Sequence, residues 1–287
     1  MFDHVQAFYQ PTSVREAVRL LQTLGPGSRV VAGATDLAVQ AERSTRFLVD
    51  ITHLGLSYVR HQAGKWVIGA TTTMAELESS KLRGFANGVI AKAASTCGAI
   101  QIRNMATVGG NLVNASPAAD TATPLLALDG SVVIQGGKGG TKIIPLHKFW
   151  SGPHSTVLNG GLVVEIQVPD CKLRSGWSFH KLGRTESDIA LVNAAAGVQC
   201  DRAGVCTDAR IAMGAVAPTP MRAAGAEAMM IGQKLSGELL DRVAEQVSRE
   251  VRPISDVRAT AEYRRAMSGV LARRALMEAA ANAGCAL

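Results

Sequence analysis

Apolar and polar positions in the first half of the chain alternate between helical and strand periods. Ser13 and Glu16 form the pattern of a capping box, and apolar residues at helical spacing follow it. The runs RVVAG and RFLVDI have the pattern of buried strands and flank a short helical segment, LAVQAER. This strand–helix–strand order predicts a small parallel unit. Thr73 and Glu76 make a second capping box, which predicts a helix that ends near Lys81.

The pattern changes character near residue 170. Before it, we expect two strands in YVRHQAGKWVIGATTT, two buried helices in GVIAKAASTCG and AADTATPLLALDG, a hairpin with a flexible tip in SVVIQGGKGGTKIIPL and a strand in GLVVEIQVP. After it, GWSFHKLG, LVNAAAGVQC and ARIAMGAVAP predict three antiparallel strands, and ELLDRVAEQVSREV and AEYRRAMSGVLARRALMEAAANA predict two helices. The sequence therefore predicts two regions of different character, with a boundary near residues 170–175.

Composition and charge exclude several classes of function. The 287 residues are 47% hydrophobic and 18% charged, which is typical of a globular protein. The 30 basic residues exceed the 23 acidic ones and give a net charge of +7, but they are scattered, and aromatic residues make up only 4% of the chain. Nucleic-acid sites combine a basic stripe with stacking aromatics, so we expect no nucleic-acid partner. The excess charge is expected on a solvated surface or on a face that docks an acidic protein.

The cysteines and the apolar runs bear on the cellular compartment of the protein. The five cysteines are odd in number and lack C-x-x-C spacing, so we expect no disulfide framework, metal or iron–sulfur cluster on this chain. Cys200 and Cys206 flank a predicted hairpin turn, DRAG, and should be neighbours on paired strands. No apolar run is long enough to span a membrane, and the N-terminus lacks the pattern of a secretory signal. These features predict a cytoplasmic protein with reduced cysteines.

The first glycine motif, VVAGATDL, follows a predicted strand. A strand that turns through the small residues Ala32, Gly33 and Ala34 into a helix presents successive backbone N–H groups, which bind phosphate. Thr35 can add a hydroxyl donor. The alternative is an ordinary strand-to-helix turn capped by Thr35 or Asp36.

The second motif is ATVGGNLVNASPAAD, residues 106–120. Thr107, Gly109 and Gly110 would form another anion cradle, and Asn111 could add a side-chain amide. Asp120 lies where a carboxylate could accept hydrogen bonds from a ribose diol. The alternative is a β-bulge with a helix-capping aspartate. Standard nucleotide-binding fingerprints are absent, but two cradles in one domain favour a ligand with two phosphates held between two subdomains.

Four segments together resemble a known family. AGATDL, IRNMATVGGNLVNASPAAD, KLGRTESDIALVNAAAG and ATAEYRRAMSGVLARRAL are similar, in order and spacing, to the FAD-binding medium subunits of molybdenum hydroxylases. This family includes the flavin subunits of carbon monoxide dehydrogenase and nicotinate dehydrogenase and the flavin domain of xanthine dehydrogenase. The resemblance implies an α+β fold, with a two-subdomain FAD-binding domain of the vanillyl-alcohol-oxidase/PCMH-like type over residues 1–172, split near residues 55–60. A C-terminal α+β domain with a three-stranded antiparallel sheet and helices would follow over residues 173–287.

The resemblance also implies a set of cofactor contacts. The first loop would wrap the FAD pyrophosphate, the second would close on it, and Asp120 would take the adenosine ribose hydroxyls. Leu162 and Val163 would line the adenine or the flavin, and Lys181, or His180 if the alignment slips by one, would face the flavin. The full set is Ala32, Gly33, Ala34, Thr35, Asp36, Thr107, Gly109, Gly110, Asn111, Asp120, Leu162, Val163 and Lys181.

The implied function is electron transfer without a catalytic residue of this chain. Substrate would be hydroxylated at a molybdenum cofactor on a large subunit, and electrons would pass through two [2Fe–2S] clusters of a small subunit to FAD on this chain. NAD, a quinone or oxygen would then accept them, and the complex would be a dimer of heterotrimers. Two alternatives stay open: a free-standing FAD-dependent oxidoreductase of related fold, and a non-catalytic assembly paralogue.

Several side chains near the implied site have two readings. Ile189 and Ala190 would lie close to the isoalloxazine edge by resemblance. Arg103 would either favour reduced flavin or tie down its own loop, and His154 is more often incidental than catalytic. The arginines of the last helix are expected to form a solvated or subunit-facing stripe: Arg264, Arg265, Arg273 and Arg274.

Overall fold

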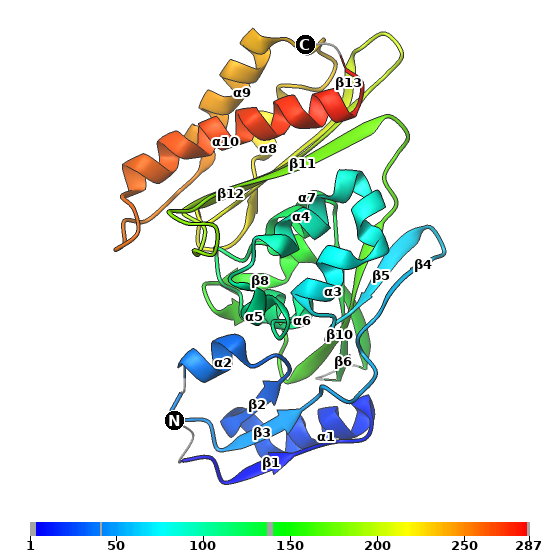
Figure 1. Ribbon diagram of the computed structural model, residues 1–287, viewed down its shortest axis with the longest axis vertical. Helices are drawn as coiled ribbons and strands as arrows, with labels where there is room; N and C mark the ends of the chain where they lie inside the picture. The colour runs from blue at the N-terminus through cyan, green and yellow to red at the C-terminus, as the bar shows by residue number, and fades with distance from the viewer. Residues whose placement is uncertain (1–3, 41, 137–139, 286–287) are drawn as a thin grey trace.

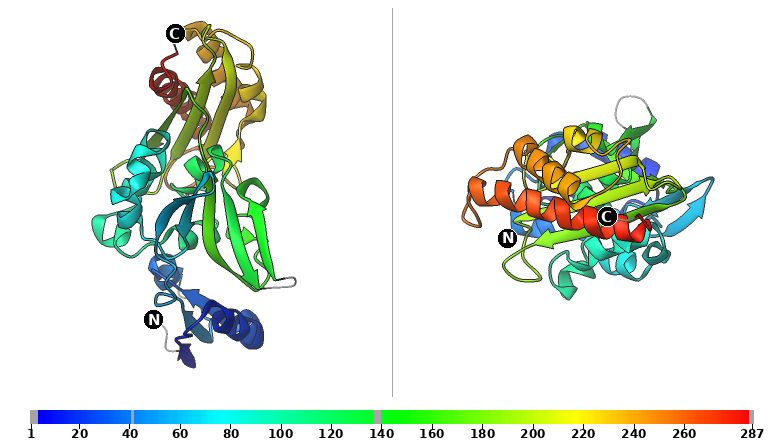
Figure 2. Two further views of the ribbon diagram at one scale, coloured as in Figure 1. Left: turned by 90° about the vertical axis from the view of Figure 1, so that its right-hand side faces the viewer. Right: turned by 90° about the horizontal axis from the view of Figure 1, so that it is seen from above.

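The computed structural model describes residues 4–40, 42–136 and 140–285. The molecule is elongated, and three parts follow one another along its length in chain order (Figure 1). The N-terminal part lies at one end and the C-terminal helices lie at the other (Figure 2). The tip of the predicted hairpin, residues 137–139, lies outside the described residues.

The first part is a three-stranded sheet with two helices. Its elements are β1 (Ala7–Tyr9), α1 (Val14–Leu24), the 3-10 turn η1 (Gly25–Gly27), β2 (Ser28–Val31), α2 (Thr35–Gln40) and β3 (Phe47–Asp50). β3 pairs in parallel with both β1 and β2, which confirms the predicted parallel unit. The Ser13 hydroxyl accepts the Glu16 N–H at 3.2 Å, as a capping residue does. The Glu16 carboxylate, however, accepts from the Thr12 N–H instead of that of Ser13.

The middle part contains an antiparallel sheet in the order β4-β5-β10-β6-β7. These strands are β4 (Val59–Gln62), β5 (Lys65–Gly69), β6 (Ser131–Gly136), β7 (Thr141–Pro145) and β10 (Gly161–Pro169). The helices are α3 (Met74–Ser79), α4 (Val89–Ser95), α5 (Ile100–Arg103), α6 (Val108–Val113) and α7 (Ala122–Ala127). Shorter elements are η2 (Lys81–Gly84), η3 (Ala86–Gly88), η4 (Leu146–Lys148), β8 (Trp150–Gly152) and β9 (Ser155–Thr156). The predicted capping box of Thr73 and Glu76 begins α3, and both of its hydrogen bonds are present.

The last part is an antiparallel sheet covered by helices. Its elements are β11 (Ser175–Leu182), β12 (Val192–Cys200), β13 (Cys206–Gly214), β14 (Met221–Arg222), α8 (Ala224–Ala228), α9 (Gly237–Glu250) and α10 (Ala261–Asn282). The α+β class and the three predicted long strands are confirmed. The expectation of three strands misses β14, because a strand of two residues is too short to show a period of two.

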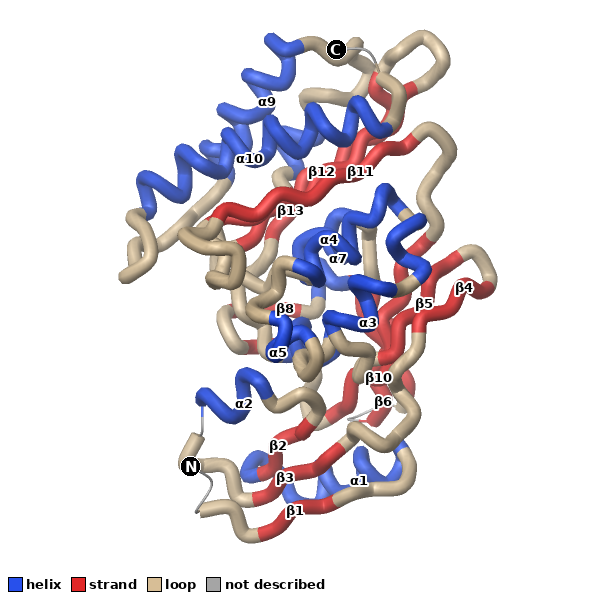
Figure 3. The backbone as a smooth tube through the Cα atoms, in the orientation of Figure 1, coloured by secondary structure: helices blue, strands red, loops and turns tan. Residues whose placement is uncertain are grey.

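The C-terminal sheet is buried on both faces. α9 and α10 cover one face, and α4 and α7 of the middle part lie against the other (Figure 3). Trp177 and Phe179 join the core of the middle part, whereas the hydroxyl of Ser178, on the opposite face of β11, donates to the Ala275 carbonyl of α10 at 2.7 Å. The two sides of residue 172 therefore share one hydrophobic core.

The cysteine expectation is partly wrong. Cys200 and Cys206 are partners in the register of β12 and β13, as predicted. Cys200 also forms a disulfide with Cys285, which lies 85 residues further along the chain. This pair depends on α10 folding back over β12, so cysteine spacing could not indicate it. Cys97, Cys171 and Cys206 are free.

The described residues contain no helix that is both long and apolar enough to cross a bilayer. They also contain no cluster of histidine, cysteine and acidic side chains that could hold a metal ion.

Candidate functional site

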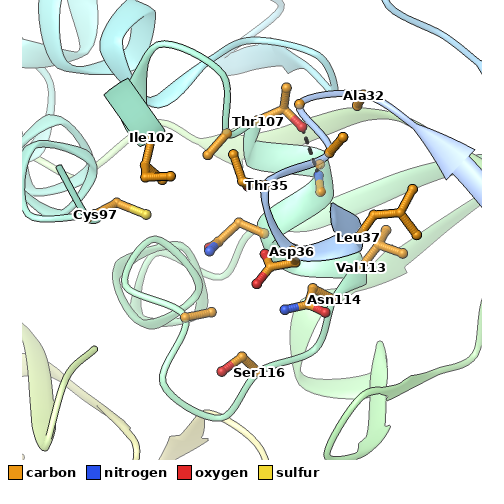
Figure 4. A pocket seen from close by; sticks show the side chains of 18 of the residues that line it. Ala32, Thr35, Asp36, Leu37, Cys97, Ile102, Thr107, Val113, Asn114 and Ser116 are labelled. Carbon is orange, nitrogen blue, oxygen red and sulfur yellow. Dashed lines mark hydrogen bonds between the residues drawn. The ribbon is translucent and has the colours of Figure 1, made fainter. Parts of the chain in front are cut away.

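A cavity of about 450 Å³ lies where the three parts of the molecule meet. Its walls come from the loop between β2 and α2, from residues 97–120, from the start of β10 and from the loop 187–189. Figure 4 shows side chains from the first two of these segments around the cavity. The volume falls within the usual range for ligand and cofactor sites.

The loop from β2 to α2 supplies backbone donors to the cavity. Residues 32–37 all line it, and the N–H groups of residues 33–37 have no acceptor within the described chain. Ala34 adopts a left-handed conformation with φ 55°, which turns the chain from strand to helix. A series of N–H groups around such a turn forms a concave site for an anion. The alternative predicted from the sequence is an ordinary turn capped by Thr35 or Asp36. Such a cap would accept some of these N–H groups, and none of them has an acceptor among the described residues.

The second motif uses its glycines differently. The Gly109 N–H donates to the Ala70 carbonyl at 2.9 Å, and a Cβ on Gly109 would lie 2.6 Å from that oxygen. Thr107 caps α6 by accepting the Gly110 N–H at 3.2 Å, so the segment is a helix start and not a β-bulge. The close approach at Gly109 is thus made by the protein's own backbone.

In the second motif, the candidate donors to the cavity come from side chains and not from the backbone. The Asn111 Oδ1 accepts from the Thr121 hydroxyl at 2.6 Å, which leaves the Nδ2 group without an acceptor among the described residues. Asn111 lines the cavity, as do Thr107, Gly109 and Gly110. The two cradles predicted from the sequence therefore face one cavity with different chemistry.

A hydrogen bond joins the first part of the molecule to α6 beside the cavity. Gln40 Nε2, at the end of α2, donates to Asn114 Oδ1 at 2.9 Å. The Asn114 carbonyl lies 3.0 Å from His154 Nδ1. Burial raises the pKa of the Asp36 carboxyl, and the nearby His154 opposes that shift. Nothing local in the sequence marks Gln40 as a site residue, because its partner lies 74 positions away.

Asp120 and Lys181 form a buried ion pair at the cavity wall. Lys181 Nζ lies 2.7 Å from Asp120 Oδ2, and each side chain is only 6% exposed. Asn193 Nδ2 donates to Asp120 Oδ1 at 3.1 Å. Burial raises the pKa of Asp120, and Lys181 and Asn193 oppose the shift. Each carboxylate oxygen can accept a second hydrogen bond, so Asp120 keeps capacity for a ligand hydroxyl.

The two candidate flavin-facing residues of β11 point in opposite directions. Lys181 faces Asp120, and its ammonium also donates to the Thr96 carbonyl at 2.7 Å. His180 Nε2 lies 2.7 Å from Glu278 Oε2 of α10. Neighbouring residues of a strand point to opposite faces. Lys181 therefore lies on the face of β11 that is turned toward the cavity, and His180 lies on the other face. Lys181 is not itself among the described residues that line the cavity.

Apolar residues complete the walls. Leu162 and Val163 of β10 are buried and line the cavity beside a bulge that follows Val163. Ile189 lines it from the other side and is 54% exposed, whereas Ala190 is fully buried. Cys97 also lines the cavity, and burial first, with Asp120 second, raises its thiol pKa to about 11, so it stays protonated.

Two arginines have structural contacts. Arg103 donates to the Gly98 carbonyl at 2.8 Å and pairs with Glu78 at 3.3 Å, which favours the second reading, that it ties down its own loop. The expectation of a solvated or subunit-facing stripe is wrong for Arg264, which is 3% exposed. Its guanidinium donates to the carbonyls of Leu191 and Ala215, where two β-strand connections meet. Charge patterning on a helix could not distinguish this buried arginine from its exposed neighbours.

The backbone donors, apolar walls and buried carboxylate around this cavity are suited to an elongated anionic cofactor. Comparisons with known proteins identify the family. A model of the FAD-binding domain in molybdopterin dehydrogenase matches residues 2–171, and a model of the CO dehydrogenase flavoprotein C-terminal domain matches residues 177–279. The chain therefore belongs to the FAD-binding medium subunits of molybdenum hydroxylases, a family of oxidoreductases, and this confirms the resemblance seen in the sequence.

Relatives match over nearly the whole chain. The carbon monoxide dehydrogenase medium chain of Hydrogenophaga pseudoflava is 31% identical over 284 residues, covering 97% of this chain and 98% of that one. The xanthine dehydrogenase FAD-binding subunit of Escherichia coli O157:H7 is 31% identical and covers 99% of each chain. The solved carbon monoxide dehydrogenase from H. pseudoflava lacking the Mo-pyranopterin moiety of its cofactor matches with a TM-score of 0.94, at 31% identity, over 100% of both chains. Quinoline 2-oxidoreductase from Pseudomonas putida 86 matches with a TM-score of 0.90 at 26% identity, over 99% of both chains.

Proposed function

We propose that this chain holds FAD in the cavity and transfers electrons within a multi-subunit molybdenum hydroxylase. The observation that carries the proposal is the set of unpartnered backbone N–H groups of residues 33–37 at the cavity wall. Such groups bind a diphosphate through hydrogen bonds from the main chain. When bound, FAD supplies both one-electron and two-electron redox chemistry, so the protein needs no nucleophile or metal of its own.

The chain's residues then have distinct tasks. The backbone of residues 32–36 binds the diphosphate, while the Asn111 amide and the Thr107–Gly110 turn close the opposite wall. Asp120 accepts the ribose hydroxyls, and Leu162 and Val163 exclude water from one face of the cofactor. Ile189 covers the exposed edge of the cavity. We propose that the chain divides into a FAD-binding domain over residues 1–172, split near residues 55–60, and a C-terminal domain over residues 173–287.

The proposal requires partner subunits. Two [2Fe–2S] clusters need eight thiolates in ferredoxin-like spacing, whereas this chain has five cysteines, two of them in a disulfide. We place the clusters on a small subunit and the molybdenum cofactor on a large one, in a cytoplasmic dimer of heterotrimers. Two curated relatives are named as a medium chain and as a FAD-binding subunit, in keeping with this division. Electrons enter from the clusters and leave to NAD, a quinone or oxygen.

Purification of the native protein tests the proposal. When this chain is purified under mild conditions through an affinity tag, two further subunits should co-purify with it. Molybdenum, iron and FAD should elute in the same chromatographic peak. Anaerobic reduction by substrate followed by candidate acceptors would identify the acceptor. A yellow protein that purifies alone and oxidises a small substrate without partners would contradict the proposal.

A further inference from the structure

We infer that Lys181 is a positioning residue for the cofactor cavity, because its ammonium ties two separate segments of the cavity wall to the C-terminal sheet. The inference rests on the proposed FAD site. Lys181 Nζ lies 2.7 Å from Asp120 Oδ2 and 2.7 Å from the Thr96 carbonyl. Asp120 lines the cavity directly, and Thr96 precedes Cys97 and Gly98, which also line it. One cation thus fixes two walls that are distant in the sequence.

Further buried hydrogen bonds hold Asp120 in the orientation that contacts Lys181. Asn193 of β12 donates to the other Asp120 oxygen at 3.1 Å, and Thr123 of α7 donates to Asn193 Oδ1 at 2.7 Å. Gly214 of β13 makes room for both, since a Cβ there would collide with Asn193 Oδ1 and would lie 2.6 Å from the Thr123 hydroxyl. Asn193 and Thr123 are fully buried. The orientation of Asp120 therefore depends on residues from three strands of the C-terminal sheet.

Lys181 also neutralises the charge of Asp120. Asp120 is a buried carboxylate in the wall of a cavity proposed to hold an anionic diphosphate. Lys181 is the charged group that faces Asp120, Asn193 faces it as a neutral donor, and the nearby Cys97 thiol stays protonated. Without Lys181, an ionised Asp120 would be buried and unpaired, which is costly, and it would repel the ligand. FAD affinity should therefore become dependent on pH when Lys181 is removed.

The test measures the Kd for FAD of the full chain, stripped of cofactor, across mildly acidic to mildly alkaline pH. Four proteins are compared: the wild type, K181M, K181M/D120N and H180Q. K181M should bind FAD about tenfold more weakly at alkaline pH, within the range of coupled neighbours. Its affinity should recover as pH falls, because protonation of Asp120 removes the unpaired charge. K181M/D120N should show an intermediate Kd that does not vary with pH.

H180Q is the matched control, since it changes the adjacent position of β11, whose side chain lies beside Glu278 on the face turned away from the cavity. Its Kd should equal that of the wild type. A K181M Kd that equals the wild-type value, or that stays weak at every pH, would overturn the inference. If K181M does not fold, K181M/D120N carries the test, and a wild-type Kd for it would overturn the inference. Failure of the wild type to bind FAD would instead contradict the proposed function.

Discussion

Gly33 lies directly against the backbone of Met105, so closely that a Cβ on Gly33 would fall on the Met105 carbonyl group. The contact joins the loop after β2 to the segment that precedes α6. Both segments line the cavity. The glycine is therefore required by the meeting of two main chains, and its N–H remains free to face a ligand.

We predict that G33A separates these walls. Because the colliding atoms are backbone, they cannot rotate away, and overpacking of this kind costs about 1–3 kcal/mol. Urea unfolding of the stripped protein should show that loss, and FAD content should fall with it. G27A is the control, because a Cβ on Gly27 meets only ordinary contacts at 3.6 Å or more. Normal FAD content in a stable G33A protein would contradict the close packing of the loops.

The glycine pair of α6 should respond unequally. G109A places a Cβ 2.6 Å from the Ala70 carbonyl and should destabilise the fold by about 1–3 kcal/mol. A Cβ in G110A meets only the Thr107 hydroxyl, at 2.9 Å. Rotation of that hydroxyl breaks its N-cap bond to α6, at a cost of about 1 kcal/mol, and the higher helix propensity of alanine offsets this cost, so the free energy of unfolding should change by less than about 1 kcal/mol. Thermal melts of the two stripped variants provide the comparison. Equal losses would show that the glycines have the same role.

Sequence reasoning succeeded where the signal is local. The Thr73–Glu76 capping box, the parallel unit around β3 and the three long strands of the C-terminal sheet each depend on residues within one or two turns or one strand. The cavity-lining residues of both glycine motifs were also found, because small residues after a strand are themselves a local signal.

The remainder depends on contacts between distant segments. No pattern near Gly109 identifies Ala70 as its neighbour, and no spacing pairs Cys200 with Cys285. The expected cofactor contacts do not include Asn193, although the segment KLGRTESDIALVNAAAG contains it. A lone asparagine within the apolar run LVNAAAGV needs a buried partner, and that signal could have indicated the Asp120 network.

Ala34 has φ 55°, a left-handed conformation that favours glycine. A left-handed conformation costs a residue with a Cβ about 1–2 kcal/mol, and the added freedom of glycine in the unfolded chain offsets about 0.4–1 kcal/mol of that. A34G should therefore stabilise the stripped protein by about 0.5 kcal/mol. Chemical denaturation measures this difference. A clear loss of stability would show that Ala34 makes a favourable contact that outweighs its backbone conformation.

The disulfide predicts a thiol count. Titration of the denatured protein without reductant should detect the three free cysteines, Cys97, Cys171 and Cys206. C285S should lose about 2–4 kcal/mol of stability, because the bond closes a long loop of the unfolded chain. C171S, which removes a free thiol, is the control. Detection of five thiols would show that the bond does not form in solution.

The Gln40–Asn114 hydrogen bond predicts a kinetic effect. Q40A removes a contact that joins the two sides of the cavity, and the side chains involved are exposed. Such a bond contributes only about 0.5–1.5 kcal/mol, so stability should change little. Release of FAD, followed by the rise in flavin fluorescence after dilution of the loaded protein, should become about threefold to tenfold faster. An unchanged release rate would show that this contact does not restrain the cofactor.

Competitive titration of the stripped full chain tests the central claim most directly. FAD, ADP and riboflavin are each added to the wild-type protein, and binding is followed by flavin fluorescence or by displacement of FAD. If the backbone of residues 33–37 holds a diphosphate, FAD should bind one per chain, ADP should displace it, and riboflavin should bind far more weakly. Riboflavin binding as tightly as FAD, with no displacement by ADP, would contradict the account.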